Sequence, residues 1–320
     1  MSYKSLYRKR KVVIVGAGDV GSTHGFALAK SGLCEEIVFI DKNEDLAKGQ
    51  VLDLVHGQSF FPTVAIRTGS SIDYADAQVI VITAGASQKK GETRLDLLNK
   101  NAGMIRSITR DIVNSGSEGV VIMVSNPVDV LTYVFLEASG WDRGRVIGSG
   151  TVLDSARFKY LLSKHCDVNV HNIHAYILGE HGDSEFAAWS MTHLGGITWT
   201  EYCKICGRCD NSQDVRANIE QQVKDSAYHI IGYKGSTYFA VAMALLEIVE
   251  AVLRGQNSVL TVSVLLKGEF GLENVCLSVP CIISDGGVKE ILAGPLNEPE
   301  HQQLIRSSEI IKRAIGEVEE

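Results

Sequence analysis

The sequence contains no apolar run long enough to span a bilayer, and its N-terminus lacks the apolar centre of a signal peptide. Its seven cysteines are odd in number and spread along the chain, which favours reduced thiols over a disulfide framework. From these absences we expect a cytoplasmic protein. Internal repeats, low-complexity tracts and flexible linkers are also missing, so the parts of the chain should pack closely together.

Outside the N-terminus, acidic residues outnumber basic ones. The chain has a net charge of −7, but its first eleven residues carry five positive charges and no acidic residue, so the remainder has a net charge of −12. Such an acidic body argues against nucleic-acid binding. We interpret residues 1–10 as a basic arm, which either leads into the first strand as a solvated segment or reaches a partner.

The first half of the chain alternates apolar runs with helical patterns. Hydrophobic residues make up 45% of the 320 positions, enough for a large core and more than one domain. Short β-branched runs, typical of strands buried on both faces, lie at 12–15, 36–41, 79–83 and 120–124. Stretches of helical spacing lie near 20–31, 43–56 and 92–115. The alternation predicts an α/β fold with a doubly wound parallel (Rossmann) sheet over residues 11–150.

After about residue 150 the pattern changes to longer helices. We expect these near 153–164, 212–231 and 236–254, followed by two extended segments at 258–266 and 275–284 that alternate well enough to pair. A final helix has apolar positions on one face, at Leu304, Ile311, Ile315 and Val318. Residues 151–320 therefore read as a second, α+β domain, with a cleft between the two halves.

A glycine-rich turn follows the first predicted strand and precedes a helix. In Gly16-Ala-Gly-Asp-Val-Gly21, Gly16 permits a tight turn, Gly18 lets the backbone approach a pyrophosphate, and Gly21 allows close helix–strand packing. Asp41 ends the second strand, twenty residues after Gly21, where a carboxylate binds an adenosine ribose and repels a 2′-phosphate. The alternative is a glycine turn with an N-capping aspartate. The strand–glycine–helix context favours an NAD site.

Two polar segments follow later strands, at the sheet edge where ligands bind in this architecture. Residues 84–96 form a loop with glycines at 85 and 91, which suits a lid, and Arg94 on that loop can stabilise oxygen charge as a carbonyl is reduced. The alternative for Arg94 is a surface arginine. Asn126 ends the next strand, where it either donates to a substrate oxygen or caps a helix near Pro127.

His181 lies between two glycines after an apolar run, and histidine is the side chain that titrates nearest neutral pH. Asp154 and Arg157 are three positions apart on a predicted helix and therefore share a face. They form either an exposed ion pair or a functional pair, in which one meets His181 and the other binds a carboxylate.

These motifs, taken together and in this order, closely resemble the L-lactate/malate dehydrogenase family, and within it the bacterial L-lactate dehydrogenases. The resemblance covers almost the whole chain. It rests on Gly16-Ala-Gly-Asp-Val-Gly21, Gly85-Ala-Ser-Gln88, Gly91-Glu-Thr-Arg94, Val124-Ser-Asn-Pro127, Leu153-Asp-Ser-Ala-Arg157 and Gly179-Glu-His-Gly-Asp183.

The resemblance implies hydride transfer between NAD and C2 of a small 2-hydroxy acid. His181 is then the proton donor and acceptor, Asp154 orients it, and Arg157 binds the substrate carboxylate. Arg94 and Asn126 contact the C2 oxygen, and Thr237 lies near the substrate. The implied cofactor contacts are Gly16, Gly18, Val20, Gly21, Asp41, Gly85, Ala86, Val124, Asn126 and Ser149.

Gln88 separates the two branches of that family. Malate dehydrogenases have an arginine at this position, which pairs with the second carboxylate of oxaloacetate. A neutral glutamine leaves that carboxylate unpaired in a closed site, whereas the methyl group of pyruvate leaves nothing unpaired. We therefore expect pyruvate and lactate as substrates.

The resemblance also implies regulation and assembly. Many bacterial members are activated by fructose 1,6-bisphosphate, bound at a subunit interface by an arginine and a histidine. His174 matches the histidine, and Lys159 stands in place of the arginine, with its charge but without its planar fork. The alternative for His174 is an ordinary strand histidine. The family suggests a homotetramer.

Cys203, Cys206 and Cys209 have a spacing that suits zinc or an iron–sulfur cluster. No fourth cysteine follows closely, and the family resemblance includes no metal here, so we expect no metal site.

Three functions compete with lactate dehydrogenase: a malate or other 2-hydroxyacid dehydrogenase, a non-catalytic NAD-binding sensor, and an NAD-dependent hydrolase on a related fold, which would need a metal.

Overall fold

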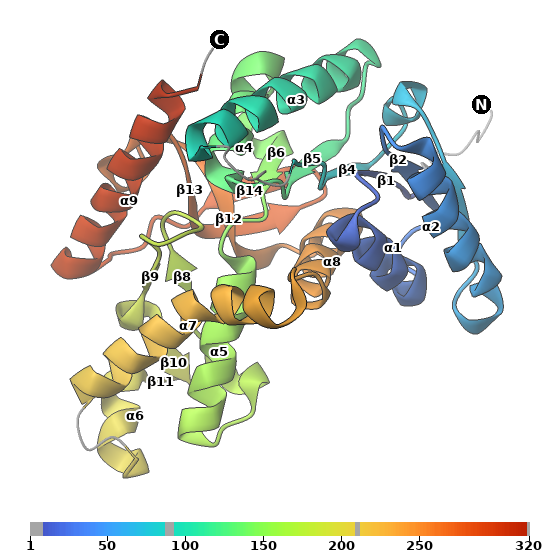
Figure 1. The fold of residues 1–320 in the computed structure, drawn as a ribbon. Helices are drawn as coiled ribbons and strands as arrows, with labels where there is room; N and C mark the ends of the chain where they lie inside the picture. The colour runs from blue at the N-terminus through green and yellow to red at the C-terminus, as the bar shows by residue number, and fades with distance from the viewer. Residues whose placement is uncertain (1–8, 87–92, 209–211, 319–320) are drawn as a thin grey trace, which may run out of the picture.

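A computed structural model describes residues 9–86, 93–208 and 212–318 of the protein. These residues form a nine-stranded sheet with the order β14-β13-β12-β6-β5-β4-β1-β2-β3 (Figure 1). Its parallel part comprises β1 (Lys11–Val15), β2 (Glu36–Ile40), β3 (Ala65–Thr68), β4 (Val79–Ile82), β5 (Val120–Met123) and β6 (Val146–Gly148). The strand order 3-2-1-4-5-6 is that of a doubly wound dinucleotide-binding sheet.

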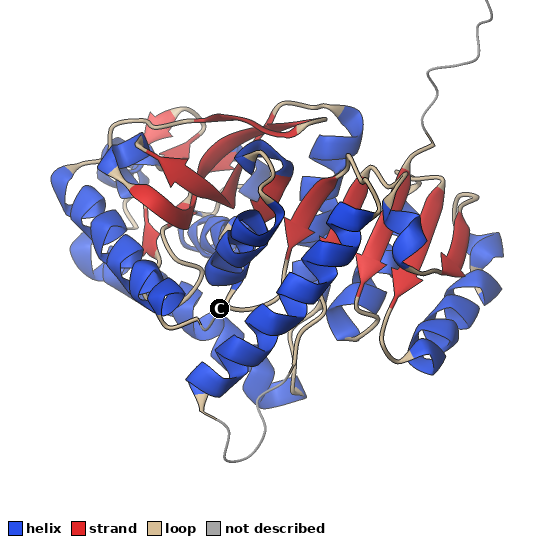
Figure 2. Ribbon diagram, turned by 90° about the horizontal axis from the view of Figure 1, so that it is seen from above, coloured by secondary structure: helices blue, strands red, loops and turns tan. Residues whose placement is uncertain are grey.

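Helices cover both faces of this parallel sheet (Figure 2). α3 lies above it in Figure 1, whereas α1 and α8 lie beside each other below it. Because both faces are covered, β1, β4 and β5 are buried along their whole lengths. The four helices of this half are α1 (Asp19–Ser31), α2 (Glu44–His56), α3 (Arg94–Asn114) and α4 (Val128–Ser139).

The two long strands predicted in the second half do pair. β12 (Ser258–Lys267) runs antiparallel to β13 (Glu273–Ser284), and β14 (Gly287–Ile291) follows as the edge strand. These strands do not form a sheet of their own, because β12 pairs with β6 at Ser263 and Gly148. One sheet therefore runs through both halves of the chain and fixes them relative to each other.

The remaining elements gather around a second, smaller core. This core contains Phe158, Leu162, Ile173 and Trp199. Around it lie α5 (Val152–Cys166), α6 (Trp199–Cys206) and α7 (Ser212–Lys234), with the short strands β7 (Ile173–His174), β8 (Ile177–Leu178), β9 (Phe186–Ala187), β10 (His193–Leu194) and β11 (Ile197–Thr198). Helix α8 (Phe239–Arg254) packs instead into the main core and against α1.

The C-terminal helix α9 (Glu298–Gly316) begins at a capping box, in which Asn297 and Glu300 satisfy each other's backbone amides. Leu304 and Ile311 are buried as predicted, whereas Val318 lies beyond the helix end. Within the described ranges, no helix has the length and hydropathy needed to cross a membrane.

Candidate active site

The glycine-rich turn at the start of α1 cannot accept side chains at two of its three glycines. Gly16 has a φ of +105°, and a Cβ there would lie 2.7 Å from the backbone nitrogen of Ala84. A Cβ on Gly21 would lie 1.9 Å from the carbonyl oxygen of Gly16. Gly18, the N-cap of α1, faces open space and has no capping side chain. An anion can therefore approach the amides at this helix end, which is what a pyrophosphate requires.

Asp41 lies beside this turn at the carboxyl end of β2. Its carboxylate accepts hydrogen bonds from the backbone nitrogens of Ala17, at 2.7 Å, and Asn43, at 2.8 Å. Gly16, Asp41 and Gly85 line one cavity of about 290 Å³. The backbone cradle and the adjacent carboxylate fit an NAD molecule with its pyrophosphate at α1 and its adenosine ribose at Asp41.

His181 and Asp154 form the predicted pair. The Nδ1 atom of His181 lies 2.7 Å from an oxygen of Asp154, whose other oxygen accepts a 2.7 Å hydrogen bond from Nη1 of Arg157. Asp154 is 2% exposed and the His181 side chain is 29% exposed, so this is a partly buried triad centred on a buried carboxylate and not the exposed ion pair that the sequence left open. Asp154 sits between the two cations and joins them.

The charges of this triad set its protonation. Burial by itself lowers the pKa of His181, but the charge and hydrogen bond of Asp154 outweigh it and raise that pKa to about 9. Burial raises the pKa of Asp154, but His181 and Arg157 hold it below its usual value. At neutral pH the imidazole is therefore charged and ready to donate a proton.

A second buried carboxylate, which the sequence reasoning missed, holds the His181 backbone. Asp129 on α4 is 1% exposed and accepts a 2.8 Å hydrogen bond from the backbone nitrogen of His181. Burial raises the pKa of Asp129 to about 6. The signal was available, because Asp129 is the only charged residue in the apolar run Val128–Leu136, and a charge in such a run needs a buried partner.

Gly179 fixes the other side of the histidine loop. Its φ is +95°, and its backbone exchanges hydrogen bonds of 3.0 and 2.9 Å with Ser278 of β13. A Cβ there would lie 2.6 Å from the hydroxyl of Ser307 on α9. The loop is therefore attached to the large sheet at Gly179 and to α4 at His181.

The predicted substrate and nicotinamide residues meet in one small cavity of about 200 Å³. It lies between the cofactor helix α1, the ends of β5 and β6, and helices α5, α7 and α8. Its remaining walls are mostly apolar, which suits a small substrate with one charged end. The predicted residues that line it are Val20, Val124, Asn126, Ser149, Arg157, His181 and Thr237.

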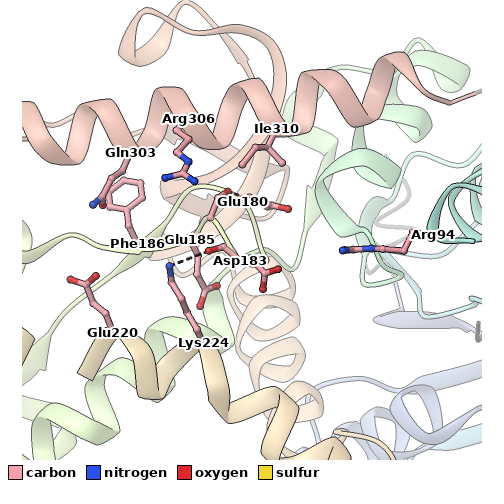
Figure 3. A pocket seen from close by; sticks show the side chains of 11 residues that line it. Arg94, Glu180, Asp183, Glu185, Phe186, Glu220, Lys224, Gln303, Arg306 and Ile310 are labelled. Carbon is pink, nitrogen blue, oxygen red and sulfur yellow. Dashed lines mark hydrogen bonds between the residues drawn. The ribbon is translucent and has the colours of Figure 1, made fainter. Parts of the chain in front are cut away.

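Arg94 does not lie in this cavity. It is the first residue of α3, and its side chain lines a neighbouring cavity of about 470 Å³ with Glu180, Asp183 and Lys224 (Figure 3). Gln88 and Gly91 lie outside the described residues.

Asn101, another residue that the sequence reasoning missed, connects the start of the predicted lid to the substrate cavity. Its side chain accepts a 2.9 Å hydrogen bond from the backbone nitrogen of Ala86 and donates a 3.0 Å hydrogen bond to the carbonyl oxygen of Asn126. Asn101 is 3% exposed. Its position within α3 gave no sequence signal of this contact.

The residues matched to an activator site lie away from the cavity. Lys159 on α5 has its Nζ atom 5.8 Å from the ring centre of Tyr176, and burial lowers the pKa of this lysine. His174, two positions before Tyr176, is exposed on β7. Cys203 and Cys206 lie half-buried on α6, and Cys209 lies outside the described residues.

A doubly wound sheet with an NAD cradle, next to a histidine–carboxylate pair and an arginine, defines an NAD-dependent dehydrogenase of small acids. Profiles of the lactate/malate dehydrogenase NAD-binding domain and α/β C-terminal domain match residues 10–148 and 151–320. The chain belongs to the lactate/malate dehydrogenase family, and the predicted family and fold class are confirmed.

The individual relatives agree with this assignment. An L-lactate dehydrogenase of Treponema denticola is 55% identical over 97% of this chain and 99% of its own length. A solved lactate dehydrogenase from a Medee basin deep-sea metagenome library has a TM-score of 0.94 at 40% identity, covering 97% of this chain and 99% of its own. The ligand-bound minor L-lactate dehydrogenase of Enterococcus mundtii also has a TM-score of 0.94, at 38% identity over 98% and 99%.

Proposed function

We propose that this protein is an NAD-dependent L-lactate dehydrogenase, which reversibly reduces pyruvate to (S)-lactate in glycolysis and lactate fermentation. The observation that carries the proposal is the His181–Asp154–Arg157 triad around a buried carboxylate, which opens into the same cavity as Val20 of the cofactor helix. The curated bacterial relatives bear the name L-lactate dehydrogenase. NADH, when bound, supplies the hydride.

The chain's own residues bind the acid and move the proton. Arg157 uses one of its five N–H donors on Asp154, so the others remain for the substrate carboxylate. His181 donates its proton to the C2 oxygen during pyruvate reduction and must be neutral to accept one during lactate oxidation. Asn126 donates to the same oxygen, and Thr237 contacts the substrate. Arg94 reaches that oxygen after a movement of α3's first turn toward the cavity.

The test is NADH oxidation, followed by absorbance, with a panel of 2-oxoacids. We expect the highest kcat/KM with pyruvate. Preference for oxaloacetate would replace the proposal with malate dehydrogenase, and absence of turnover with every 2-oxoacid would favour a non-catalytic NAD-binding sensor.

The choice of pyruvate over oxaloacetate rests on Gln88. We expect Gln88→Arg to move the preference toward oxaloacetate, because the new guanidinium pairs with its second carboxylate. The ratio of kcat/KM values for the two substrates measures this change.

We propose in addition that fructose 1,6-bisphosphate activates the enzyme through Lys159 and His174. The exposed imidazole of His174 and the positive charge of Lys159 support this proposal, although the partial burial of Lys159 weakens it as a phosphate ligand. A pyruvate saturation curve with and without the bisphosphate is the test. Superimposable curves would remove the proposal.

We propose a cytoplasmic protein with residues 1–10 as a basic arm, 11–150 as the NAD-binding domain and 151–320 as the substrate domain.

We propose that the chain assembles as a homotetramer. Assembly is supported by an apolar hollow of about 320 Å³ between α1 and α8, around which Phe26, Phe239 and Met243 are more than half exposed. Light scattering coupled to size-exclusion chromatography measures the mass. A monomeric mass would overturn the assembly.

A further inference from the structure

Glu185 is a buried acid that the proposed reaction does not use. It immediately precedes β9 and is 4% exposed. Its backbone nitrogen donates to the carbonyl oxygen of Gly182 at 3.1 Å, which closes the turn after His181. No described residue donates a hydrogen bond to its carboxyl group. A glutamate in such a place costs free energy unless nearby charges stabilise it.

The carboxyl group of Glu185 lies next to the proton-transfer pair. One of its oxygens, an oxygen of Asp154 and a ring nitrogen of His181 all lie within 4.8 Å of one another. Charges at this distance in a buried site change each other's ionisation strongly. Ionised Glu185 favours the charged imidazole and disfavours a charged Asp154.

The groups around Glu185 come from several elements (Figure 3). Asp154 and Arg157 lie on α5, and Lys224 and Glu220 on α7, while Arg306 on α9 lines the same cavity. Burial is the main cause that raises the pKa of Glu185 well above its usual value, and the charge of Asp154 adds to it. His181, Lys224 and Arg157 act in the opposite direction. Glu185 lines this cavity and not the substrate cavity, and the two cavities share no lining residue.

We propose that Glu185 is a positioning residue for proton transfer, a second carboxylate that keeps His181 a proton donor to higher pH than Asp154 alone would. The inference rests on the proposed function, in which His181 carries the proton. The negative charge of Glu185 acts through His181 and touches neither substrate nor cofactor.

The direction of the effect follows from the charges. At low pH Glu185 is neutral and has little influence on the imidazole. Once it ionises, its charge stabilises the imidazolium, so His181 keeps its proton to higher pH. Replacing Glu185 by glutamine removes this charge, and His181 then loses its proton at lower pH.

Glu185→Gln is the test, with kcat/KM measured against pH for pyruvate reduction and for lactate oxidation. We expect the midpoints of both profiles to move toward acid by about one pH unit, since an opposite charge at this distance shifts a pKa by about one to three units. Glu185→Asp keeps the carboxylate on a side chain shorter by one methylene and should give intermediate midpoints. Glu220→Gln, on the wall of the same cavity, should keep the wild-type midpoints.

Each outcome decides the inference. Lower maximal rates with unchanged midpoints in Glu185→Gln would mean a structural role and would overturn the proposal. If Glu185→Gln does not fold, midpoints of Glu185→Asp equal to those of the wild type would overturn it as well. Wild-type protein without pyruvate turnover would contradict the proposed function instead, so the two failures are distinct.

Discussion

Removing the charge of Asp154 should make the enzyme's activity depend strongly on pH. The pKa of His181 lies at about 9, against an ordinary value of 6.5, and apart from the opposing effect of burial its main cause is Asp154. A difference of this size corresponds to about 3 kcal/mol in favour of the imidazolium. In Asp154→Asn most of this stabilisation is lost, while the shape of the side chain is kept.

The expected loss can be worked out at each pH. Pyruvate reduction needs the charged imidazole. At pH 8 nearly all of the wild-type imidazole, with a pKa near 9, is charged. In the variant, with a pKa near 6.5, only about 3% is charged, which predicts a loss of roughly 30-fold in kcat/KM. At pH 6 most of the imidazole is charged in both proteins, so the variant should lose little through protonation. The measurement is kcat/KM for pyruvate from pH 5.5 to 9.5.

A defect of equal size at every pH would refute this reasoning, because it would show that Asp154 acts by orientation alone and not through its charge. Arg157 loses a charged partner in the same variant, which can weaken substrate binding at all pH values. Asn126→Ala, which removes a donor at the substrate without altering the triad, provides the matched control. Its pH midpoint should equal that of the wild type.

Three other changes test other parts of the structure. Arg157→Lys should lower kcat/KM for pyruvate by about 100-fold, mainly through KM, because the ammonium lacks the planar fork that matches a carboxylate; steady-state kinetics measure this, and an unchanged KM would contradict the assignment. Asp41→Ala should weaken NADH binding, measured by fluorescence titration, and should reduce the preference for NADH over NADPH. Asp73→Asn should lower the free energy of unfolding by about 3 kcal/mol, since Asp73 is 7% exposed and holds buried Lys11 at 2.9 Å together with Arg67. Although burial opposes it, these cations hold the pKa of Asp73 well below its usual value, so the stabilisation is complete above about pH 4 and is lost only as the pH falls through that lowered pKa. Urea midpoints of the wild type and the variant at pH 7 and pH 2 measure it, and an equal loss of unfolding free energy at both pH values would be inconsistent with this origin.

The central strands could be predicted because their apolar, β-branched composition indicates that they are buried. β1, β4 and β5 are apolar on both faces, so three to five β-branched residues in a row identify them. β3 alternates between exposed and buried residues over only four positions, which is too short a pattern to recognise. α4 was missed for the opposite reason, because it is buried on nearly all sides and shows no helical period.

The connection of β12 to β6 could not be read from either segment. Strands at 258–267 and 273–284 predict their own pairing by alternation, but nothing in their sequence indicates which third strand they join. The contact at Ser263 and Gly148 is made possible by a glycine whose Cβ would lie 2.6 Å from Thr132. Such a requirement for a small residue is visible only when the neighbours are known.

The acids around His181 could likewise be predicted only in part, because the sequence of one segment does not show its tertiary neighbours. The triad residues were identifiable because each belongs to a motif, but the two carboxylates that accompany them, Asp129 and Glu185, come from an apolar helix and from the turn after the histidine. Asp129 acts on the backbone of His181, whereas Glu185 lies within 4.8 Å of its ring. An imidazole among three acids has a pKa that belongs to the group and not to one residue. The reaction type therefore follows from the motifs, whereas its pH range depends on tertiary contacts that bring these acids together.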